Sequence, residues 1–360
     1  MGRSNGGSTV AVGLMSGTSG DGVSAALVRI GPGRSVHVLR HLTEAFSRPE
    51  QRAVLALRDA TSSQLSEANV LLGRRFASAA RLVMRSGPRP VVIGSHGHTA
   101  WHDPGRHTLQ VGEPSIIAEE TGVDVVADFR PRDIAAGGQG APLVPFFDEF
   151  VFGGSRRRIA LLNIGGIANV SLVGGGKPTI AFDTGPGNTL IDEMVRRLTK
   201  GRQSYDRGGA IARTGRIDAK LLDRWLADPY FRKRPPKSTG RERFDADFAG
   251  VRPSADGIAT LTLFTARTIA DALRRFAPVE VIASGGGVFN GALMGHLAWL
   301  LSPARLTTSD AHGIPPLAKE CAAFALFAVR AIQGRVNTVP SATGARHAVV
   351  AGKMIRGGRG

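Results

Sequence analysis

The chain has 360 residues, of which 42% are hydrophobic and 21% charged, an ordinary globular composition with room for about two domains. Cys321 is the single cysteine, which excludes an intrachain disulfide and a zinc site built on cysteines. No apolar run approaches the ~20 residues of a membrane span. We therefore expect a cytoplasmic protein without a membrane partner. The net charge of +17 would attract anions, but the few aromatic residues do not interleave with the basic clusters, so we expect no nucleic-acid partner.

Two strand–turn–strand segments open the two halves of the chain, at residues 10–31 and 159–176. Each begins with an apolar strand, turns over glycines and short polar side chains, and returns as a second strand. Two halves that begin alike indicate a duplicated architecture with one hairpin in each domain.

The later segments alternate between strands and helices. Residues 179–198 predict a strand, a Gly-Pro-Gly turn and a helix that starts near Asn188 or Thr189, and residues 279–297 predict a strand, a triple-glycine turn and a helix. Residues 258–276 and 312–333 predict helices, and residues 344–353 can form a closing strand. The alternation favours an α/β fold. We expect domains at 1–150 and 151–360, with the option that the last strand returns to the first domain.

Glycine-rich turns stand at four strand ends and read "SGTSGDG", "NIGGIAN", "DTGPGN" and "SGGG". Such turns expose consecutive backbone N–H groups, which suit phosphate oxygens, so together they favour a nucleotide site over mere tight turns. The chain has no Walker A motif, no G-x-G-x-x-G motif that opens a helix and no G-x-S-x-G elbow. These absences argue against P-loop, Rossmann and α/β-hydrolase sites.

The stretch "GSHGHTAWHDPGRH" contains His96, His98 and His102. Their spacing alone allows three zinc ligands with an open fourth position. Asp103 is the only acidic residue nearby, so an interpretation without metal, as polar groups beside a binding site, stays open as well.

The paired hairpins, with Asp21 in the first and Asp183 after a third strand, resemble the actin, Hsp70 and sugar kinase superfamily of ATPases. The resemblance is most specific to the anhydro-N-acetylmuramic acid kinase family and extends from Val10 to about Gly352. It is carried, in the family's order, by "GLMSGTSGDGVSAAL", "GSHGHTAWHDP", "LQVGEPSIIAEETGVDVVADFRPRDIAAGGQGAPLVP", "NIGGIANVSLV", "FDTGPGN", "YDRGGAIARTG", "PPKSTGRERF", "SGGGVFN" and "PSATGA". It implies a two-domain actin-like ATPase with ribonuclease H-like duplicated domains, an ATP cleft between them, and a homodimer.

The resemblance also implies a reaction. Water opens the 1,6-anhydro ring of 1,6-anhydro-N-acetylmuramic acid, and O6 takes the γ-phosphate of ATP with Mg²⁺ as cofactor, which gives N-acetylmuramic acid 6-phosphate for cell-wall recycling. A kinase for another anhydrosugar such as levoglucosan, or an actin-like ATPase that binds partners, are the alternatives.

Site residues follow from the matching motifs. Asp183 is implied as the base and Asp21 as a Mg²⁺ ligand. The implied nucleotide-binding residues are Gly17, Thr18, Ser19, Gly20, Asp21, Gly22, Val23 and Ser24, then Asn163, Gly165 and Gly166, and on the adenosine side Gly285, Gly286, Gly287 and Asn290. The implied sugar-binding residues are His96, His98, Thr99, Arg130, Asp133 and Glu320; a guanidinium suits the lactyl carboxylate because it can bind both oxygens. Lys237, Ser238 and Thr239 match a family loop without an assigned role.

The chain departs from the family pattern at three positions. His98 stands where the family usually has Gln, Ser24 where it has a second acid, and Gly20 where it has Leu. Because imidazole titrates and an amide does not, we expect His98→Gln to stay active with a KM for the sugar that varies less than in the wild type between about pH 5.5 and 7.5.

Overall fold

The structure is a computed structural model that describes residues 7–17 and 19–358. The described chain forms two compact units, one that extends to Val151 and resumes at Gly313, and one that comprises Phe152–His312. The first unit thus takes the whole segment from Gly313 onward, whereas the sequence suggested that only the last strand returns to it.

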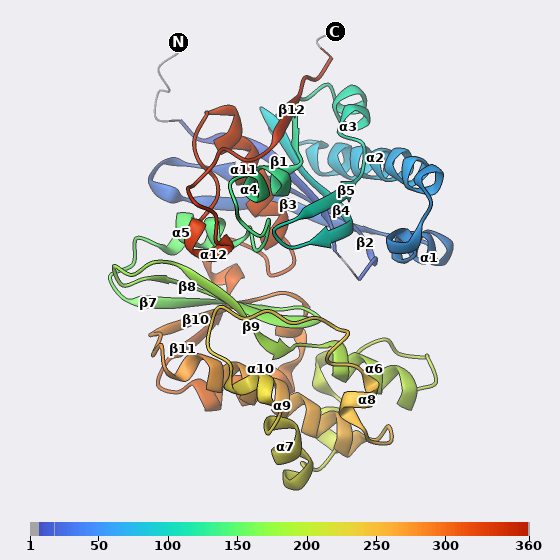
Figure 1. The fold of residues 1–360 in the computed structure, drawn as a ribbon, viewed down its shortest axis with the longest axis vertical. Coiled ribbons are helices and arrows are strands. Elements are labelled where there is room, and N and C mark those ends of the chain that lie inside the picture. Colours follow the sequence, from blue (N-terminus) through green and yellow to red (C-terminus); the bar gives the residue numbers. More distant parts are fainter. Residues whose placement is uncertain (1–6, 18, 359–360) are drawn as a thin grey trace. The chain divides into compact units, whose positions relative to one another are not determined.

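The sheet of the first unit is seven-stranded, in the order β12-β6-β4-β1-β2-β3, with β5 paired to β4 (Figure 1). β1 (Thr9–Ser16), β2 (Gly22–Ile30) and β3 (Val36–Ala45) form an antiparallel meander. β4 (Val92–Asp103) and β6 (Val125–Ala127) then continue parallel to β1, while β5 (His107–Val111) and β12 (Lys353–Ile355) pair antiparallel.

The sheet of the second unit repeats this plan with five strands, in the order β11-β10-β7-β8-β9. β7 (Arg158–Ile164), β8 (Ile167–Gly174) and β9 (Ile180–Pro186) form the antiparallel meander. β10 (Glu280–Ser284) and β11 (Arg305–Thr308) follow parallel to β7. The same order and the same directions in both sheets confirm the duplicated, ribonuclease H-like α/β architecture.

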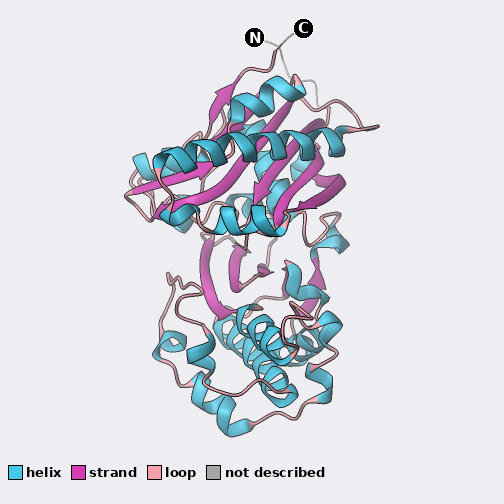
Figure 2. Cartoon of the chain, turned by 90° about the vertical axis from the view of Figure 1, so that its right-hand side faces the viewer, coloured by secondary structure: helices cyan, strands magenta, loops and turns pink. Residues whose placement is uncertain are grey.

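Helices cover both faces of the first sheet because its strands are apolar on both sides. Along β1 and β2, Ala11, Ala26 and Val28 belong to the core under α11 (Lys319–Ile332), whereas the alternate residues Val12 and Leu27 belong to the core under α2 (Ser62–Met84). In Figure 2, α2 is the long helix that crosses in front of the strands of this sheet. The remaining helices of this unit are α1 (Arg48–Leu55), α3 (Pro114–Thr121), α4 (Phe129–Ala135), α5 (Pro145–Phe152) and α12 (Pro340–Thr343).

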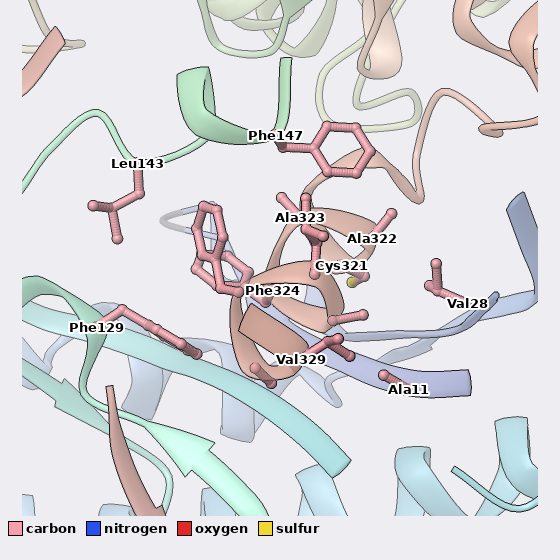
Figure 3. Packing of buried hydrophobic residues seen from close by; sticks show 14 of the residues in the cluster. Ala11, Val28, Phe129, Leu143, Phe147, Cys321, Ala322, Ala323, Phe324 and Val329 are labelled. Carbon is pink, nitrogen blue, oxygen red and sulfur yellow. The ribbon is translucent and has the colours of Figure 1, made fainter. Parts of the chain in front are cut away.

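Two strand glycines let α11 lie almost in contact with the sheet backbone. A Cβ on Gly13 would stand 1.7 Å from the carbonyl oxygen of Cys321, and one on Gly94 would stand 2.0 Å from that of Phe324. Figure 3 shows this side of the core, with Cys321 and Phe324 on α11 packed among residues of the sheet and of flanking segments. The glycines therefore fix the position of α11, whose first turn carries Glu320.

We expect Gly94→Ala to destabilise the protein by about 1–3 kcal/mol or more, because the new methyl group meets backbone atoms that no side-chain rotation can move. The matched control is Gly295→Ala, an exposed helix position with nothing within 4 Å of the added Cβ, which should stabilise by up to about 1 kcal/mol. Thermal unfolding of both variants measures this. Equal midpoints would contradict the close packing.

The second sheet is covered mainly by α9 (Ala255–Arg274) and α10 (Gly291–Leu301), which share a core with β7, β8 and β10. A further core joins α6 (Thr189–Leu198), α7 (Ala219–Leu226) and α9 to Tyr230 and Phe244, and α8 (Ala246–Ala249) contributes Ala249. Among the described residues, no helix is long and apolar enough to cross a membrane.

The elements predicted from the sequence are found with one exception. The two hairpins, the strand before Gly-Pro-Gly with α6, the strand before the triple glycine with α10, and helices α9 and α11 are all present. The closing strand at 344–353 is wrong, because side chains hold much of that segment, beside a backbone bond from the Asn337 N–H to the Val349 carbonyl at 3.0 Å. Asn337 bonds both to the N–H and to the carbonyl of Ala351, and the Thr338 hydroxyl accepts from the N–H of Val349. The strand forms only at Lys353–Ile355.

Candidate functional site

In the first unit, β4 and α4 bring a histidine and an arginine into direct contact. Arg130 Nε donates to His96 Nε2 at 3.0 Å, and Arg130 Nη1 donates to the carbonyl of Gly140 at 2.8 Å. His96 Nδ1 lies 3.1 Å from the carbonyl of Gly97, which can only accept, so the proton of this imidazole is on Nδ1 and the lone pair on Nε2 faces Arg130. The two side chains therefore fix each other's orientation.

Arg130 is a cation whose guanidinium keeps N–H groups free to bind a ligand. Its two bonds use two of the five N–H groups that a guanidinium carries. Burial lowers the pKa of Arg130 to about 10, although Glu320 and Asp133 act in the opposite direction, so it is charged at neutral pH. Burial and the charge of Arg130 hold the pKa of His96 well below its ordinary value, so this imidazole is neutral. The pair offers an oriented positive charge to a planar anion.

Asp133, also on α4, has a structural position. The side chain is fully buried, Oδ2 accepts from the N–H of Gly140 at 2.8 Å, and Oδ1 accepts from the hydroxyl of Thr343 at 2.8 Å. It therefore ties α4 to the Gly140 loop and to α12. The Gly140 loop that this carboxylate holds also carries the carbonyl that Arg130 binds, so Asp133 supports Arg130 indirectly.

Glu320 stands in the first turn of α11 and is close enough to Arg130 for their charges to interact. The neighbouring Lys319 forms a buried ion pair with Asp148 of α5 at 2.8 Å, which anchors this end of the helix. Burial raises the pKa of Glu320, although Lys319 and Arg130 act in the opposite direction. One turn further, the Phe324 ring lies 4.6 Å from the His96 ring. The fold thus gathers His96, Arg130, Asp133 and Glu320 from three segments of the chain.

His98 and Thr99 continue β4 beyond this group. His98 Nδ1 lies 3.2 Å from the hydroxyl of Ser16, its pairing partner on β1, so His98 stands next to the start of the first glycine turn. Thr99 Oγ1 accepts from Gln110 Nε2 at 3.4 Å. Among the described residues no group of three His, Cys, Asp or Glu side chains is arranged to hold a metal ion.

The structure contradicts the pH dependence expected at His98. Burial lowers the pKa of His98 to about 4, so this imidazole is already neutral between pH 5.5 and 7.5. A neutral imidazole donates and accepts one hydrogen bond each, much as the amide of Gln can. We therefore expect His98→Gln to stay active, with a KM for the sugar that follows the same pH course as the wild type. Sugar titrations at three pH values measure this, and diverging curves would mean that His98 titrates in this range.

The first glycine turn joins β1 to β2. Gly20, with φ of 62°, donates its N–H to the carbonyl of Gly17 at 3.0 Å, and Gly22 approaches β3 so closely that a Cβ would stand 2.3 Å from the Glu44 carbonyl. Thr18 lies outside the described residues. The Val23 side chain is fully buried, so Val23 can offer only backbone groups to a ligand. The Ser24 hydroxyl bonds to that of Thr43 at 2.9 Å.

Asp21 is exposed in this turn, and its Oδ1 accepts from Gln51 Nε2 of α1 at 3.2 Å. Mg²⁺ in nucleotide sites commonly takes one or two carboxylates and fills its other positions with phosphate oxygens and water. A single exposed carboxylate beside a glycine turn fits that need.

The glycine turns of the second unit lie against one another. The N–H groups of Gly187 and Asn188 donate to the carbonyls of Gly166 and Gly165, each at 2.8 Å. Gly285, with φ of 84°, approaches Asn163 so closely that a Cβ would stand 2.6 Å from its side-chain oxygen. The strand ends of β7, β9 and β10 therefore present their turns together.

The residues expected on the adenosine side differ in exposure. A Cβ on Gly287 would collide with Ile164 at 2.2 Å, whereas Gly286 has nothing within 4 Å and faces open space. Asn290 caps α10, since its side-chain oxygen accepts from the N–H of Leu293 at 3.1 Å. Asn290 is therefore already used by the fold through its oxygen.

Asp183 lies on β9, which pairs with β8, and both its backbone N–H and its backbone carbonyl are hydrogen-bonded. Its N–H donates to the carbonyl of Lys237 at 3.0 Å, and its carbonyl accepts from the hydroxyl of Tyr230 at 2.7 Å. Oδ2 of the carboxylate accepts from the N–H of Thr239 at 2.9 Å. Burial raises the pKa of Asp183 to about 6, although the Thr239 N–H and Lys237 act in the opposite direction. This is an ionised carboxylate at neutral pH, with the basicity of a general base.

The sequence predicts no chemical role for residues 230–241, the segment that contacts Asp183. Lys237 and Thr239 were identified only as part of a matching loop, and Tyr230 and Arg241 were not singled out. The Arg241 guanidinium lies against the second glycine turn, 2.8 Å from where a Cβ on Gly166 would stand. The signal available in the sequence was the basic, proline-containing run "RKRPPKSTGRER" between two helices.

A family model and curated relatives both place the chain in the same kinase family. A family model described as anhydro-N-acetylmuramic acid kinase matches residues 9–357. The anhydro-N-acetylmuramic acid kinase of Caldanaerobacter subterraneus is 40% identical over 95% of this chain and 96% of its own. That of Pseudomonas paraeruginosa is 43% identical over 95% of this chain and 98% of its own. A solved ROK family glucokinase from Streptomyces griseus, in complex with glucose and AMPPNP, covers 89% of this chain and 99% of its own at 12% identity and a TM-score of 0.40.

Proposed function

Because the chain belongs to the anhydro-N-acetylmuramic acid kinase family, we propose that it opens the ring of 1,6-anhydro-N-acetylmuramic acid and phosphorylates O6 with ATP, in cell-wall recycling. The products are N-acetylmuramic acid 6-phosphate and ADP. Water supplies the new hydroxyl at C1, the C1–O6 bond breaks, and O6 forms a bond to the γ-phosphorus as the bond from that phosphorus to ADP breaks.

Asp183 is the group that takes the proton from the attacking water. Its pKa of about 6 lies close to the pH of the cell, where a base is ionised and still accepts a proton readily. Its carboxylate is oriented by the Thr239 N–H, so one oxygen is fixed and the other is left for water. The proton is released to solvent after turnover, which balances the reaction.

The glycine turns are proposed to bind the phosphates. Backbone N–H groups at such turns favour negative oxygens without a side chain in the way. A Cβ added at Gly17 or Gly165 would meet no heavy atom closer than 3.5 Å, and one at Gly286 would meet none within 4 Å, so the backbone is open at these three positions. Ser19, Gly20 and Gly166 are proposed with them, although Gly20 packs against Leu55 and Gly166 against Arg241. Asp21 is the proposed ligand of Mg²⁺, which when bound neutralises charge on the phosphates.

The observation that carries the choice of substrate is the Arg130 guanidinium. His96 and the Gly140 carbonyl orient it, and its remaining N–H groups suit the two oxygens of a lactyl carboxylate. Levoglucosan has no carboxylate and would leave the remaining N–H groups of this guanidinium without an anion from the substrate. The muramic acid sugar is therefore favoured over a neutral anhydrosugar.

Two further properties belong to the proposal. The enzyme acts in the cytoplasm, where ATP is available, and it forms a homodimer as the family resemblance implies. Light scattering after size exclusion tests the oligomeric state directly.

The test is incubation with ATP, Mg²⁺ and either 1,6-anhydro-N-acetylmuramic acid or levoglucosan, followed by mass spectrometry. We expect a 6-phosphate from the muramic acid sugar. In ¹⁸O-water the label should enter at C1, and label in the phosphate would mean that water attacks phosphorus. Turnover of ATP that is independent of any sugar would favour the partner-binding ATPase, and a faster reaction of levoglucosan would favour the other anhydrosugar kinase.

A further inference from the structure

Lys237 lies beside Asp183 through the pairing of their backbones. The Lys237 carbonyl accepts from the Asp183 N–H at 3.0 Å, and two residues later the Thr239 N–H donates to the Asp183 carboxylate at 2.9 Å. The segment 237–239 thus runs along β9 as an additional strand would. This arrangement keeps the Lys237 side chain in the neighbourhood of the carboxylate, whose charge it affects.

The ammonium group of Lys237 is held in place by Tyr230. Nζ lies 4.3 Å from the centre of the Tyr230 ring, and it donates to the Tyr230 carbonyl at 3.4 Å. The ring face attracts a cation. The same tyrosine donates its hydroxyl to the Asp183 carbonyl at 2.7 Å, so the Tyr230 side chain contacts both Asp183 and Lys237.

The other charges around this pair are mostly positive. Arg275 and Lys233 act on Lys237, and Arg243 acts on Tyr230 while it pairs with Asp228 at 2.5 Å. Of these charged groups, Lys237 is the one that lowers the pKa of Asp183; burial and the Thr239 N–H are the other causes of its shift.

We propose that Lys237 is a positioning residue that keeps Asp183 ionised and thereby sets the lower pH limit of the reaction. The inference rests on the proposed function, in which Asp183 must be ionised to accept a proton from water. Burial alone would hold this carboxylate protonated to a higher pH, and the neighbouring ammonium opposes that effect.

The protonation states are consistent with this role. Burial lowers the pKa of Lys237 to about 8, with Arg275 and Lys233 acting in the same direction and Asp183 in the opposite one. Lys237 is therefore charged at about pH 6, where Asp183 titrates. The wild type should gain activity with rising pH through that value, because the ionised form of Asp183 is the active one.

The test compares pH profiles of kcat/KM for wild type, Lys237→Met and Lys237→Arg. Lys237→Met should move the acidic limb upward by about one pH unit, which is a loss of about five-fold at pH 6 that vanishes above pH 8. Lys237→Arg retains the positive charge and should leave the limb close to its wild-type position. Arg234→Met, which removes an exposed cation from the same segment, is the control and should not shift it.

A loss by the same factor at every pH in Lys237→Met, with the limb unmoved, would overturn the inference and assign Lys237 a purely structural role. A limb that moves equally in Lys237→Arg would overturn it as well. Failure of the proposed function is a distinct result, since wild type would then yield no sugar phosphate. If Lys237→Met folds poorly, the Lys237→Arg comparison and a carbon-13 titration of Asp183, identified against Asp183→Asn, still measure the effect of the charge without turnover.

Discussion

Replacing Asp183 by Asn should lower kcat by about 10²–10⁴, the usual cost of losing a positioned general base. Asn is nearly isosteric and its side-chain oxygen can still accept from the Thr239 N–H, as the carboxylate does at 2.9 Å. It cannot take a proton from water at any pH. Binding of ATP and of the sugar should therefore survive while turnover is lost.

Steady-state kinetics and ligand titration by calorimetry measure the two effects separately. Thr184→Ser, one residue further on the same strand, removes only a methyl group from a fully buried side chain and is the matched control for local disturbance of β9. A kcat for Asp183→Asn above a tenth of the wild-type value would exclude Asp183 as the base.

The same variant should be more stable than wild type at neutral pH. The pKa of Asp183 is raised from 3.8 to about 6, so the folded protein binds this proton more tightly than the unfolded chain. Stability is therefore lost as pH rises through that window, by an amount on the order of 3 kcal/mol, since one pKa unit corresponds to about 1.4 kcal/mol. Asn avoids this cost. Its unfolding midpoint should exceed that of wild type at pH 7.5, with a difference that disappears towards pH 4. The trade of stability for a basic carboxylate is what a catalytic role predicts.

Much of the fold follows from local patterns. Short apolar runs on β1, β2, β7 and β8, and glycines at the turns between them, are sufficient to predict both hairpins. The same reasoning failed at residues 344–353, where the apolar pattern of a strand is present but Asn337 and Thr338 occupy the backbone groups that a strand would pair. A side chain that replaces a neighbouring strand leaves no periodic signal.

The candidate site was predictable as residues and not as contacts. Asp183 stands out because a polar side chain interrupts an apolar strand before a glycine turn. Its partners Tyr230 and Thr239 are 47 and 56 positions away, and the bond between Asp133 and Thr343 spans 210 positions. Only the folded chain distinguishes a carboxylate that supports a loop, such as Asp133, from one available to a substrate.

Replacing Arg130 by Gln should lower kcat/KM for 1,6-anhydro-N-acetylmuramic acid by about 30-fold or more, mainly through KM. Truncating one partner of a buried, hydrogen-bonded charge pair typically costs 2–5 kcal/mol, roughly 30-fold to several thousand-fold. Part of that cost comes from the charge left behind, here the carboxylate of the sugar. Glu320 loses the charge of Arg130 as well and keeps only that of Lys319, so its pKa should rise further above the ordinary value.

The decisive comparison uses a sugar that lacks only the carboxylate, 1,6-anhydro-N-acetylglucosamine. Wild type should have a much lower kcat/KM for this sugar than for the muramic acid sugar. Arg130→Gln should react with the two sugars at similar kcat/KM, because the variant no longer has a guanidinium to bind the carboxylate. Arg132→Gln is the control, since Arg132 is exposed on the same helix α4 and its loss should leave the discrimination intact. An equal loss for both sugars in Arg130→Gln would show that Arg130 holds His96 and the Gly140 loop together without binding the lactyl group. The substrate would then have to be recognised elsewhere in the chain.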